Sequence, residues 1–123
     1  SLDLYEKFYE AIVGREKSKQ EIKKAGERAF VMIKVLNARI GFARKDDKPP
    51  ERWFEPIEVD GKDQVLMDYY GVPLGKDDVE RLLDEYYEER WFDLTTGLPS
   101  AAKLADLGLA EFVETLRAKK EDN

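Results

Sequence analysis

The first stretch of the chain alternates apolar and charged residues in the pattern of an amphipathic helix. Apolar side chains recur at the spacing of one helix face: Leu4, Tyr5, Phe8, Tyr9, Ile12 and Val13. Gly14 follows, and glycine is common at a helix C-terminus because it adopts left-handed backbone angles without strain. The pattern therefore predicts an N-terminal helix that ends at Gly14.

A second, longer helix is predicted from Lys19 to Ile40. Ser18 and Glu21 have the spacing of a capping box at its start, and Gly41 marks its end. At the usual rise per residue this helix would be about 33 Å long. One stripe along it is apolar and is predicted to face inward: Ile22, Ala25, Ala29, Ile33, Leu36 and Ile40.

The second half of this helix is apolar on its other faces as well. Phe30, Val31, Met32 and Val35 lie outside the inward stripe. A helix that is apolar nearly all round is typical of a buried position. The sequence therefore predicts a long central helix packed by the chain's own neighbouring helices. An alternative stays open, in which a partner covers one side of this helix.

The segment between residues 42 and 75 interrupts the helical pattern. Proline and glycine prevent a continuous helix there: Pro49-Pro50, Pro56, Asp60-Gly61 and Pro73. Ile57 and Val59 alternate with charged residues, so a short strand is expected at Glu55–Val59. An irregular segment of this length usually wraps over another part of a structure or serves a function.

Shorter helices are predicted in the C-terminal half. The third helix begins at Lys76 or Asp77 and closes near Arg90. A short helix follows Pro99-Ser100 and stops at Gly108. The last helix runs from Ala110 to about Lys119, and the chain is expected to fray from there through Asp122. Inward residues are expected to be Val79, Leu82, Leu83, Tyr86, Tyr87, Leu104, Leu107, Phe112, Val113 and Leu116. These patterns predict a single all-α domain over residues 1–123, with about five helices around a long central helix and a long irregular Pro- and Gly-containing segment in the middle.

Composition limits the classes of partner. The chain has 123 residues, of which 42% are hydrophobic, and this suits one globular domain with one core. Its net charge of −6 argues against nucleic acid or an anionic membrane surface as a partner. The sequence has no apolar run of membrane-spanning length and no secretory signal pattern, so a cytoplasmic protein is expected.

The sequence contains no cysteine and no histidine. It therefore offers no thiolate for an iron–sulfur cluster and no imidazole for a metal or for proton transfer. Nucleophilic catalysis needs a base beside the nucleophile, and no histidine is present to activate a serine. Glycine-rich phosphate-binding loops are also missing from the sequence.

Pairs of carboxylates are the remaining candidates for metal binding or acid–base chemistry. Three such pairs occur: Asp46-Asp47, Asp60/Asp63 and Asp77-Asp78. Helix capping explains Asp77-Asp78, and a turn explains Asp60-Gly61. Asp46-Asp47 lies among basic residues, a pattern that more often locks a turn by ion pairs than it catalyses. We therefore assign no catalytic, cofactor-binding or metal-binding residue in this chain.

Neighbouring aromatic residues occur in three pairs: Tyr69-Tyr70, Tyr86-Tyr87 and Trp91-Phe92. Aromatic side chains interleaved with basic residues can stack on nucleic acid bases. The neighbours here are mostly acidic, so the three pairs are predicted to fill the core, where each buries a large area.

Five motifs follow one another along the chain. They are Gly26-Glu27-Arg28 after the capped helix start, Leu36-Asn37-Ala38-Arg39-x-Gly41, Arg44-Lys45-Asp46-Asp47-x-x-Pro50-x-Arg52, Leu83-Asp84-Glu85-Tyr86-Tyr87-x-x-Arg90, and Gly97-Leu98-Pro99 with Lys103-Leu104-x-x-Leu107-Gly108-Leu109. In this order they resemble the C-terminal region of the tungsten-pterin aldehyde ferredoxin oxidoreductases. The chain departs from the family where Trp91 directly follows Arg90, since family members usually read Arg-Gly-Trp.

This resemblance implies a part of an enzyme rather than a whole one. The family oxidises aldehydes to carboxylic acids with a tungsten-pterin cofactor and passes electrons to ferredoxin. The resemblance places the tungsten-pterin and the 4Fe-4S cluster outside this chain, on an N-terminal pterin-binding part and on upstream cysteines. It implies that this chain closes the substrate channel and shields the cluster, has no activity alone and contacts the N-terminal part. A homo-oligomer is expected for a different reason: if the long helix packs against a larger partner, the isolated chain exposes an apolar patch at Phe30, Val31, Met32 or Val35.

A second hypothesis belongs to a different functional class. A stand-alone helical protein-interaction module would use an apolar side of the long helix as a docking face. A third hypothesis, an enzyme that uses carboxylates and a divalent metal, lacks a supporting constellation of residues.

Overall fold

A computed structural model describes the backbone of residues 1–121 and the side chains of residues 1–118. Helices dominate the fold, as predicted: α1 (Leu2–Val13), α2 (Lys19–Arg39), α3 (Lys76–Glu89), α4 (Ala101–Asp106) and α5 (Val113–Glu121). Short 3₁₀ turns cover Arg44–Asp46, Glu51–Phe54 and Ala110–Phe112. The fold is mostly helical but not all-α, because strands β1 (Ile57–Val59) and β2 (Lys62–Gln64) pair in the middle segment.

Hydrogen bonds at the helix ends confirm the predicted boundaries. The Ser18 hydroxyl accepts from the Glu21 N–H (3.2 Å), and the Glu21 carboxylate accepts from the Ser18 N–H (2.8 Å), which together form the capping box. Gly14 ends α1 with a left-handed φ of 71°. The last helix begins at Val113 rather than at the preceding 3₁₀ turn. The predicted fraying extends to Asp122, which lies outside the described residues.

The strand expected at Glu55–Val59 is present as Ile57–Val59 and belongs to an antiparallel hairpin. Its register pairs Ile57 with Gln64, Glu58 with Asp63 and Val59 with Lys62. Asp60 and Gly61 form the connecting turn, with φ angles of 53° and 72°. Two consecutive positive φ angles are what a type I′ hairpin turn requires, and Asp-Gly is a favoured sequence for it.

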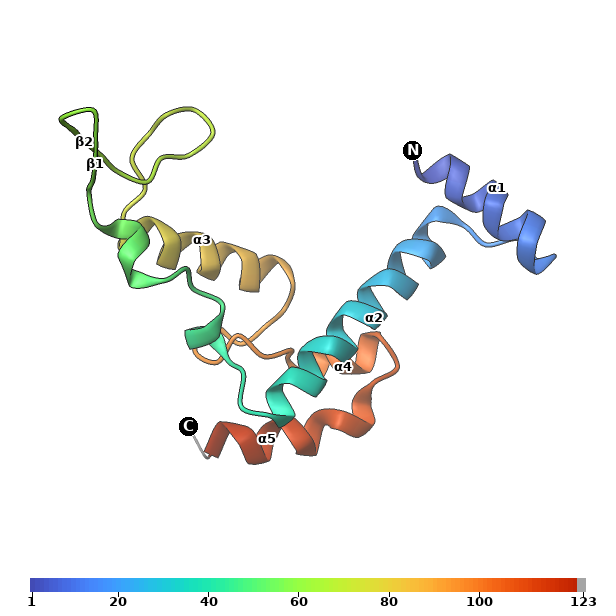
Figure 1. Cartoon of the computed structure of the whole chain (residues 1–123). Coiled ribbons are helices and arrows are strands. Elements are labelled where there is room, and N and C mark those ends of the chain that lie inside the picture. The colour runs from blue at the N-terminus through green and yellow to red at the C-terminus, as the bar shows by residue number, and fades with distance from the viewer. Residues whose placement is uncertain (122–123) are drawn as a thin grey trace.

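The hydrophobic core lies where the C-terminal half of α2 meets α4, α5 and the segment that follows α3 (Figure 1). Its buried apolar residues are Val31, Val35, Ala38, Tyr87, Phe92, Leu98, Leu104, Leu107, Leu109 and Leu116. Several of these come from the short C-terminal helices and the loops beside them. The core is therefore small, and it occupies one region of an extended molecule.

The prediction of a buried central helix is wrong for α2. Val31, Val35 and Ala38 face the core. Five of the six members of the predicted inward stripe are exposed: Ala25, Ala29, Ile33 at 56%, Leu36 at 48% and Ile40 at 74%. Both faces of this half of the helix are apolar, and periodicity alone does not determine which face the chain's own helices cover. The core residues contributed by the other elements pack on the first face.

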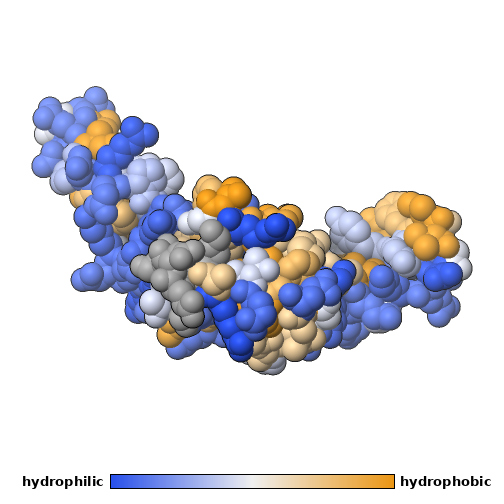
Figure 2. All heavy atoms as spheres, turned by 90° about the horizontal axis from the view of Figure 1, so that it is seen from below, coloured by the Kyte–Doolittle hydropathy of each residue, from blue (hydrophilic) through white to orange (hydrophobic). Residues whose placement is uncertain are grey.

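The helix α1 is amphipathic, as predicted, but none of its residues is buried. Five of its apolar residues are about half exposed or more: Leu4, Tyr5, Phe8, Ile12 and Val13. Figure 1 shows α1 at the far end of α2, while the β1–β2 hairpin projects from the opposite arm of an open V. In Figure 2 apolar side chains gather at one end of the elongated molecule and over its middle, whereas the other end is mostly hydrophilic with one small apolar patch.

The open shape leaves an unusually large surface in contact with water. The accessible surface is 9245 Å², whereas a folded monomer of this mass typically exposes about 6,800 Å². The chain thus exposes about 2,400 Å² more than a self-contained domain of its size. Apolar side chains contribute to this extra surface on α1, on α2 and around the hairpin.

Candidate functional site

Three of the sequence motifs meet beside the core. The turn that follows α2 contacts α3 and the segment that follows α3, although the residues in contact are 36 to 50 positions apart. The cluster that joins them, here called the polar junction, consists of Lys34, Arg44, Asp47, Glu80, Asp84 and Tyr87.

The guanidinium of Arg44 is the main cross-link of the polar junction. It donates to the carboxylates of Asp84 (2.5 Å) and Glu80 (2.7 Å), to the Leu94 carbonyl (2.6 Å) and to the Glu80 carbonyl (3.2 Å). The Arg44 N–H also donates to the Thr96 carbonyl (2.7 Å). The Arg44 side chain is only 14% exposed. Because guanidinium donors point in fixed directions, this geometry sets the position of the turn relative to α3.

A second cross-link joins the turn to a buried phenol. The Tyr87 hydroxyl donates to Asp47 Oδ2 (2.7 Å), and Lys34 Nζ donates to the same oxygen (2.5 Å). The pKa of the Tyr87 phenol is raised well above its ordinary value. Burial of the ring is the larger cause, and the hydrogen bond to Asp47 is the next. Tyr87 therefore stays protonated and remains a hydrogen-bond donor to Asp47 at neutral pH.

Gly97 lets the polar junction close tightly. A Cβ at this position would lie 2.6 Å from Tyr87 Oη, 2.8 Å from Tyr87 Cζ and 3.3 Å from Arg44 Cα. The Gly97 φ angle of 70° is also in the left-handed region that glycine adopts most easily. Because Gly97 of the Gly-Leu-Pro motif has no side chain, the Tyr87 ring and the backbone of Arg44 can approach it closely.

A different pair of motifs meets between α2 and α4. Arg28 Nε donates to the Leu107 carbonyl (3.0 Å), and the amine of Lys103, whose side chain is 9% exposed, pairs with Glu27. The Gly-Glu-Arg motif therefore contacts the Lys-Leu-x-x-Leu-Gly-Leu motif directly. The charged residues of these two motifs hold α2 and α4 together. Their contacts in this fold are architectural.

Two of the three carboxylate pairs identified in the sequence contain a carboxylate with a structural contact. Asp46 Oδ2 accepts from the Ala43 N–H (2.9 Å), and Asp78 Oδ2 accepts from the Gly75 N–H (2.9 Å), so both carboxylates cap turns or helix starts. Asp60 lies in the hairpin turn and Asp63 in β2. Among the side chains of residues 1–118, no three acidic, histidine or cysteine groups lie together so that they could hold a metal ion.

Replacing Asp46 and Asp47 together by alanine is expected to lower the free energy of unfolding. The Tyr87 hydroxyl and the Lys34 amine would lose their acceptor, and the Ala43 N–H would lose its cap. The expected loss is about 2–4 kcal/mol, measured by urea denaturation.

A double variant on the exposed hairpin, Glu58→Ala with Asp63→Ala, is the matched control. It removes the same number of carboxylates and should change the stability by less than about 1 kcal/mol. An Asp46/Asp47 variant that melts normally but loses affinity for a divalent metal would support the metal-binding alternative instead.

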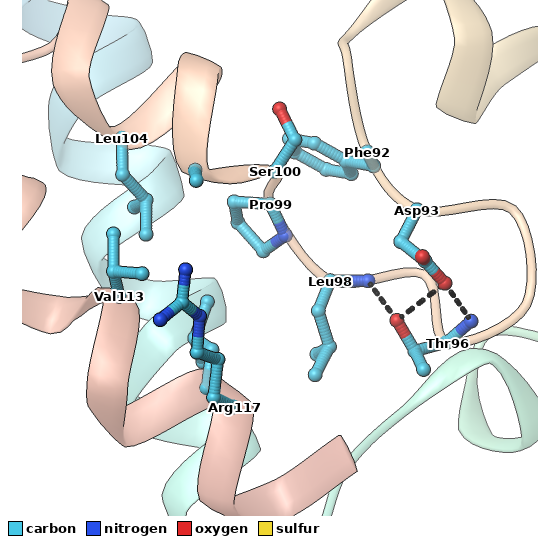
Figure 3. A pocket seen from close by; sticks show the side chains of 11 residues that line it. Phe92, Asp93, Thr96, Leu98, Pro99, Ser100, Leu104, Val113 and Arg117 are labelled. Carbon is cyan, nitrogen blue, oxygen red and sulfur yellow. Dashed lines mark hydrogen bonds between the residues drawn. The ribbon is translucent and has the colours of Figure 1, made fainter.

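Clefts next to the core are mostly apolar. A cleft of about 450 Å³ lies between α2 and α3, with Phe30, Ile33, Leu83 and Tyr86 in its walls and the Lys34–Asp47 pair at its polar side. A second cleft of about 280 Å³ lies between α5 and the segment before α4, and Figure 3 shows its lining. Mostly apolar walls of this kind suit packing or the binding of an apolar group.

The segment in the second cleft is held by a local turn. Asp93 Oδ1 accepts from the Thr96 N–H (2.8 Å) and the Thr96 hydroxyl (2.9 Å), which in turn accepts from the Leu98 N–H (3.3 Å), as Figure 3 shows. Leu98 is 5% exposed and belongs to the core. This turn therefore positions the Gly-Leu-Pro motif between the cleft and the polar junction.

The aromatic pairs have different environments. Tyr86, Tyr87 and Phe92 form a cluster with ring centroids about 6 Å apart, which confirms their predicted place in or beside the core. The core prediction is wrong for Tyr69 and Tyr70, which are 96% and 85% exposed, and for Trp91, which is 58% exposed. Sequence alone does not separate the two cases, because both pairs are adjacent tyrosines with acidic neighbours.

Trp91 adopts a conformation that usually belongs to glycine. Its φ angle is 57°, and its side chain is 58% exposed. The resemblance leads to the expectation of a glycine between Arg90 and Trp91, and in this sequence the two residues are adjacent. The backbone turn after α3 is thus present although the glycine is not, and the neighbouring Lys103 amine lies 5.6 Å from the Trp91 ring centroid.

No helix in the described part of the chain is long and apolar enough to cross a membrane.

The sequence did not reveal the partners of Arg44 and Asp47, namely Glu80, Asp84, Tyr87 and Lys34. The available signal was the alternating charge around Asp46-Asp47, which predicts ion pairs without identifying their partners.

Comparison with known proteins places these motifs in a family context. The family described as "Aldehyde ferredoxin oxidoreductase, domains 2 & 3" matches residues 1–109. A solved structure, "Active site complex BamBC of Benzoyl Coenzyme A reductase in complex with 1,5 Dienoyl-CoA", has a similar fold with a TM-score of 0.72 and 24% sequence identity. The alignment covers 97% of this chain and 16% of that chain. None of the curated protein sequences matches this chain.

Proposed function

We propose that this chain, which belongs to the aldehyde ferredoxin oxidoreductase family, is a C-terminal helical domain or fragment that has a structural role in a larger tungsten-pterin enzyme. The complete enzyme would oxidise aldehydes to carboxylic acids and pass the electrons to ferredoxin. In this proposal the chain covers the cofactor-bearing part, closes the substrate channel and shields the cluster from solvent. A cytoplasmic location is part of the proposal, because a chain without cysteine suits a reducing compartment.

The observation that carries this proposal is the combination of the family match with the exposed surface. The match extends over residues 1–109, and the chain exposes about 2,400 Å² more than a compact monomer of its mass would. Interfaces between permanently associated proteins bury 2,000 Å² or more in total, which is of this order. A large partner surface is therefore expected, and the remainder of the family's enzyme is the partner that the match supports.

The residues of this chain do not fit the family's cofactors as ligands. A 4Fe-4S cluster needs thiolates or imidazoles, and the sequence has neither cysteine nor histidine. Within the described residues, carboxylates do not gather in a group that could hold a metal ion. The family's tungsten-pterin and iron–sulfur groups would therefore be held by other parts of the enzyme, and the role of this chain toward them is to cover them.

Purified alone, the chain is expected to contain no stoichiometric tungsten, iron or pterin. Elemental analysis and the visible absorption spectrum test this expectation. Co-expression with the pterin-binding part should yield a complex that contains the cofactors and oxidises aldehydes. Stoichiometric iron or a cluster absorbance in the isolated chain would refute the proposal that the cofactors lie elsewhere, and failure to form the complex would refute the proposed partner.

The isolated chain is expected to form homo-oligomers, because contiguous apolar surfaces rarely stay solvated. The surface available for this association differs from the one expected from sequence. Val31 and Val35 are buried, whereas Ile33, Leu36 and Ile40 are exposed. A two-fold dimer with matching patches is the simplest arrangement. Light scattering at micromolar concentration measures it, and a monomer that binds no hydrophobic dye would contradict it.

The second candidate is a stand-alone helical protein-interaction module, and the exposed face of α2 is the observation that favours it. Such a module would bind a partner without any tungsten-pterin protein being present. Co-purification from cells that lack the pterin-binding part would distinguish it from the first proposal: a defined complex in such cells would favour the interaction module.

A further inference from the structure

We infer that the cleft between α2 and α3 is a docking surface for the pterin-binding part of the same enzyme, which presents an apolar segment and a carboxylate that binds Arg90. The inference rests on the proposed function. It adds the face of the chain that makes the contact and the chemistry of the group that the face recognises.

The shape and polarity of the cleft suit an apolar segment. Its volume is about 450 Å³, and Phe30, Ile33, Leu83 and Tyr86 contribute apolar walls. The exposed stripe of α2 continues from the cleft, since Ile33, Leu36 and Ile40 follow at helical spacing and are each about half exposed or more. Apolar anchors that enter such a cleft are the residues that commonly dominate the free energy of association.

Arg90 gives the surface its charge specificity. Its guanidinium lies 4.9 Å from the Tyr86 ring centroid and 5.5 Å from the Phe30 ring centroid, so Arg90 lies beside the cleft and stacks on two rings that line it. Its Nε is buried, and a partner cannot reach that atom. Arg90 as a whole is partly exposed, and its terminal nitrogens have no ion pair among the described residues, so these nitrogens are the donors open to a partner. A carboxylate is the group that best matches a guanidinium in both charge and geometry.

The other charges around the cleft are already neutralised within the chain. Lys34 pairs with Asp47 at 2.5 Å. Arg44 pairs with Glu80 and Asp84 on α3. Among the ion pairs of the described residues none involves Arg90, so its positive charge remains for a partner. The same ion pairs fix the walls of the cleft, because the polar junction joins the end of α2 to α3, and the docking surface is therefore formed before the partner binds.

The extent of exposed surface fits a partner of this kind. One side of a permanent interface buries at least about 1,000 Å², and the chain has about 2,400 Å² in excess of a compact monomer. The alignment with the solved structure covers 97% of this chain and 16% of the other, so a fold of this kind also occurs within a much longer polypeptide. The occupant expected here is thus a large folded part of the enzyme rather than a short peptide.

The test uses the chain co-expressed with a tagged pterin-binding part, and follows dissociation of the purified complex on dilution. The variant Ile33→Lys places a charge on the apolar wall, and Arg90→Glu reverses the charge that the carboxylate recognises. Each is expected to raise the dissociation constant by about 30-fold or more, as residues central to an interface do. Ile33 is 56% exposed, so its replacement should leave the helical circular dichroism and the melting temperature of the isolated chain unchanged.

Arg90→Met and Tyr69→Asp separate the chemical claims. Methionine keeps most of the packing against the rings, so Arg90→Met should weaken binding and flatten its dependence on salt concentration, because the ion pair is lost. Tyr69 is 96% exposed in the loop between β2 and α3, which Figure 1 shows beside the hairpin, and it does not line the cleft. Tyr69→Asp should therefore change the dissociation constant by less than about 3-fold, as peripheral residues do.

Three outcomes would count against the inference, and they are distinguishable. If the unmodified chain forms no complex with the pterin-binding part, the proposed function itself fails. If the complex forms but Ile33→Lys and Arg90→Glu leave its affinity unchanged, the proposed function survives and the docking surface lies elsewhere. An unchanged salt dependence in Arg90→Met would overturn the recognition of a carboxylate.

Discussion

Replacing Gly97 by alanine is expected to destabilise the domain strongly. The new Cβ would lie 2.6 Å from Tyr87 Oη and 2.8 Å from Tyr87 Cζ, distances at which the neighbouring ring must move. Tyr87 is fully buried and hydrogen-bonded to Asp47, so its ring has no free space to enter. Overpacking of a core typically costs about 1–3 kcal/mol, and a left-handed backbone costs a non-glycine residue about 1–2 kcal/mol more.

The expected loss of about 2–5 kcal/mol is a large share of the stability of a small domain, and urea denaturation measures it. Gly108→Ala is the matched control. Gly108 has a nearly identical φ of 68°, but a Cβ there would meet no atom within 4 Å. It should lose only the backbone contribution, about 1–2 kcal/mol. Equal losses in the two variants would mean that the contact between Gly97 and Tyr87 contributes nothing.

Replacing Arg44 by alanine is expected to lower the stability by about 3 kcal/mol, because charge-assisted hydrogen bonds from a largely buried guanidinium would be lost. Its partners Glu80 and Asp84 are 40% and 49% exposed and can be hydrated in the variant. The carbonyl of Leu94 would lose a donor at 2.6 Å. Arg44→Lys should recover only part of the loss, since an amine cannot donate in all of these directions at once.

Arg81→Ala is the control for Arg44→Ala. Arg81 also pairs with two carboxylates on α3, Glu85 at 2.9 Å and Asp78 at 3.8 Å, but its side chain is 60% exposed. A solvated pair of this kind contributes about 0–1 kcal/mol. If Arg81→Ala and Arg44→Ala destabilise the chain equally, the burial of the Arg44 guanidinium is not what makes its contacts strong.

Acid should weaken the polar junction in a defined direction. Hydrogen bonds from Lys48 and then Arg44 hold the pKa of the Glu80 carboxyl below its usual value. A carboxyl whose pKa is lower in the folded state stabilises the fold above its unfolded pKa, and this contribution is lost as the pH falls through the folded pKa. The stability advantage of Arg44 over its alanine variant should therefore shrink as the pH decreases below about 4.

Local structure could be predicted well from the sequence. The Ser18–Glu21 capping box, the end of α1 at Gly14 and the Asp60-Gly61 turn all depend on contacts within a few residues. In each case one residue type is strongly favoured for a backbone reason that the sequence displays directly. Of the hairpin, the sequence predicts the first strand and not its partner at Lys62–Gln64, because a three-residue strand has almost no periodic pattern.

The long-range contacts could not be predicted in the same way. The charged turn was correctly interpreted as an ion-paired structure, but its partners on α3 are 36 and 40 residues away. For α2 the sequence does not determine which of two apolar faces is buried. Val31 and Ile33 are equally apolar, and only the position of the other helices decides that Val31 is buried while Ile33 is exposed. A face shaped for a partner has the same composition as a face shaped for the core.

The lack of any buried residue in α1 has a consequence for the time course of amide hydrogen exchange. A helix of 12 residues is barely stable in water without packing. Its amides should exchange through local opening, with protection factors close to those of a free peptide. The Arg44 amide, hydrogen-bonded to Thr96 across the polar junction, should exchange only when the whole domain opens. A partner bound along α1 would slow the exchange of the α1 amides and so reduce their difference from the Arg44 amide. Hydrogen exchange measured at single amides would therefore detect such a partner.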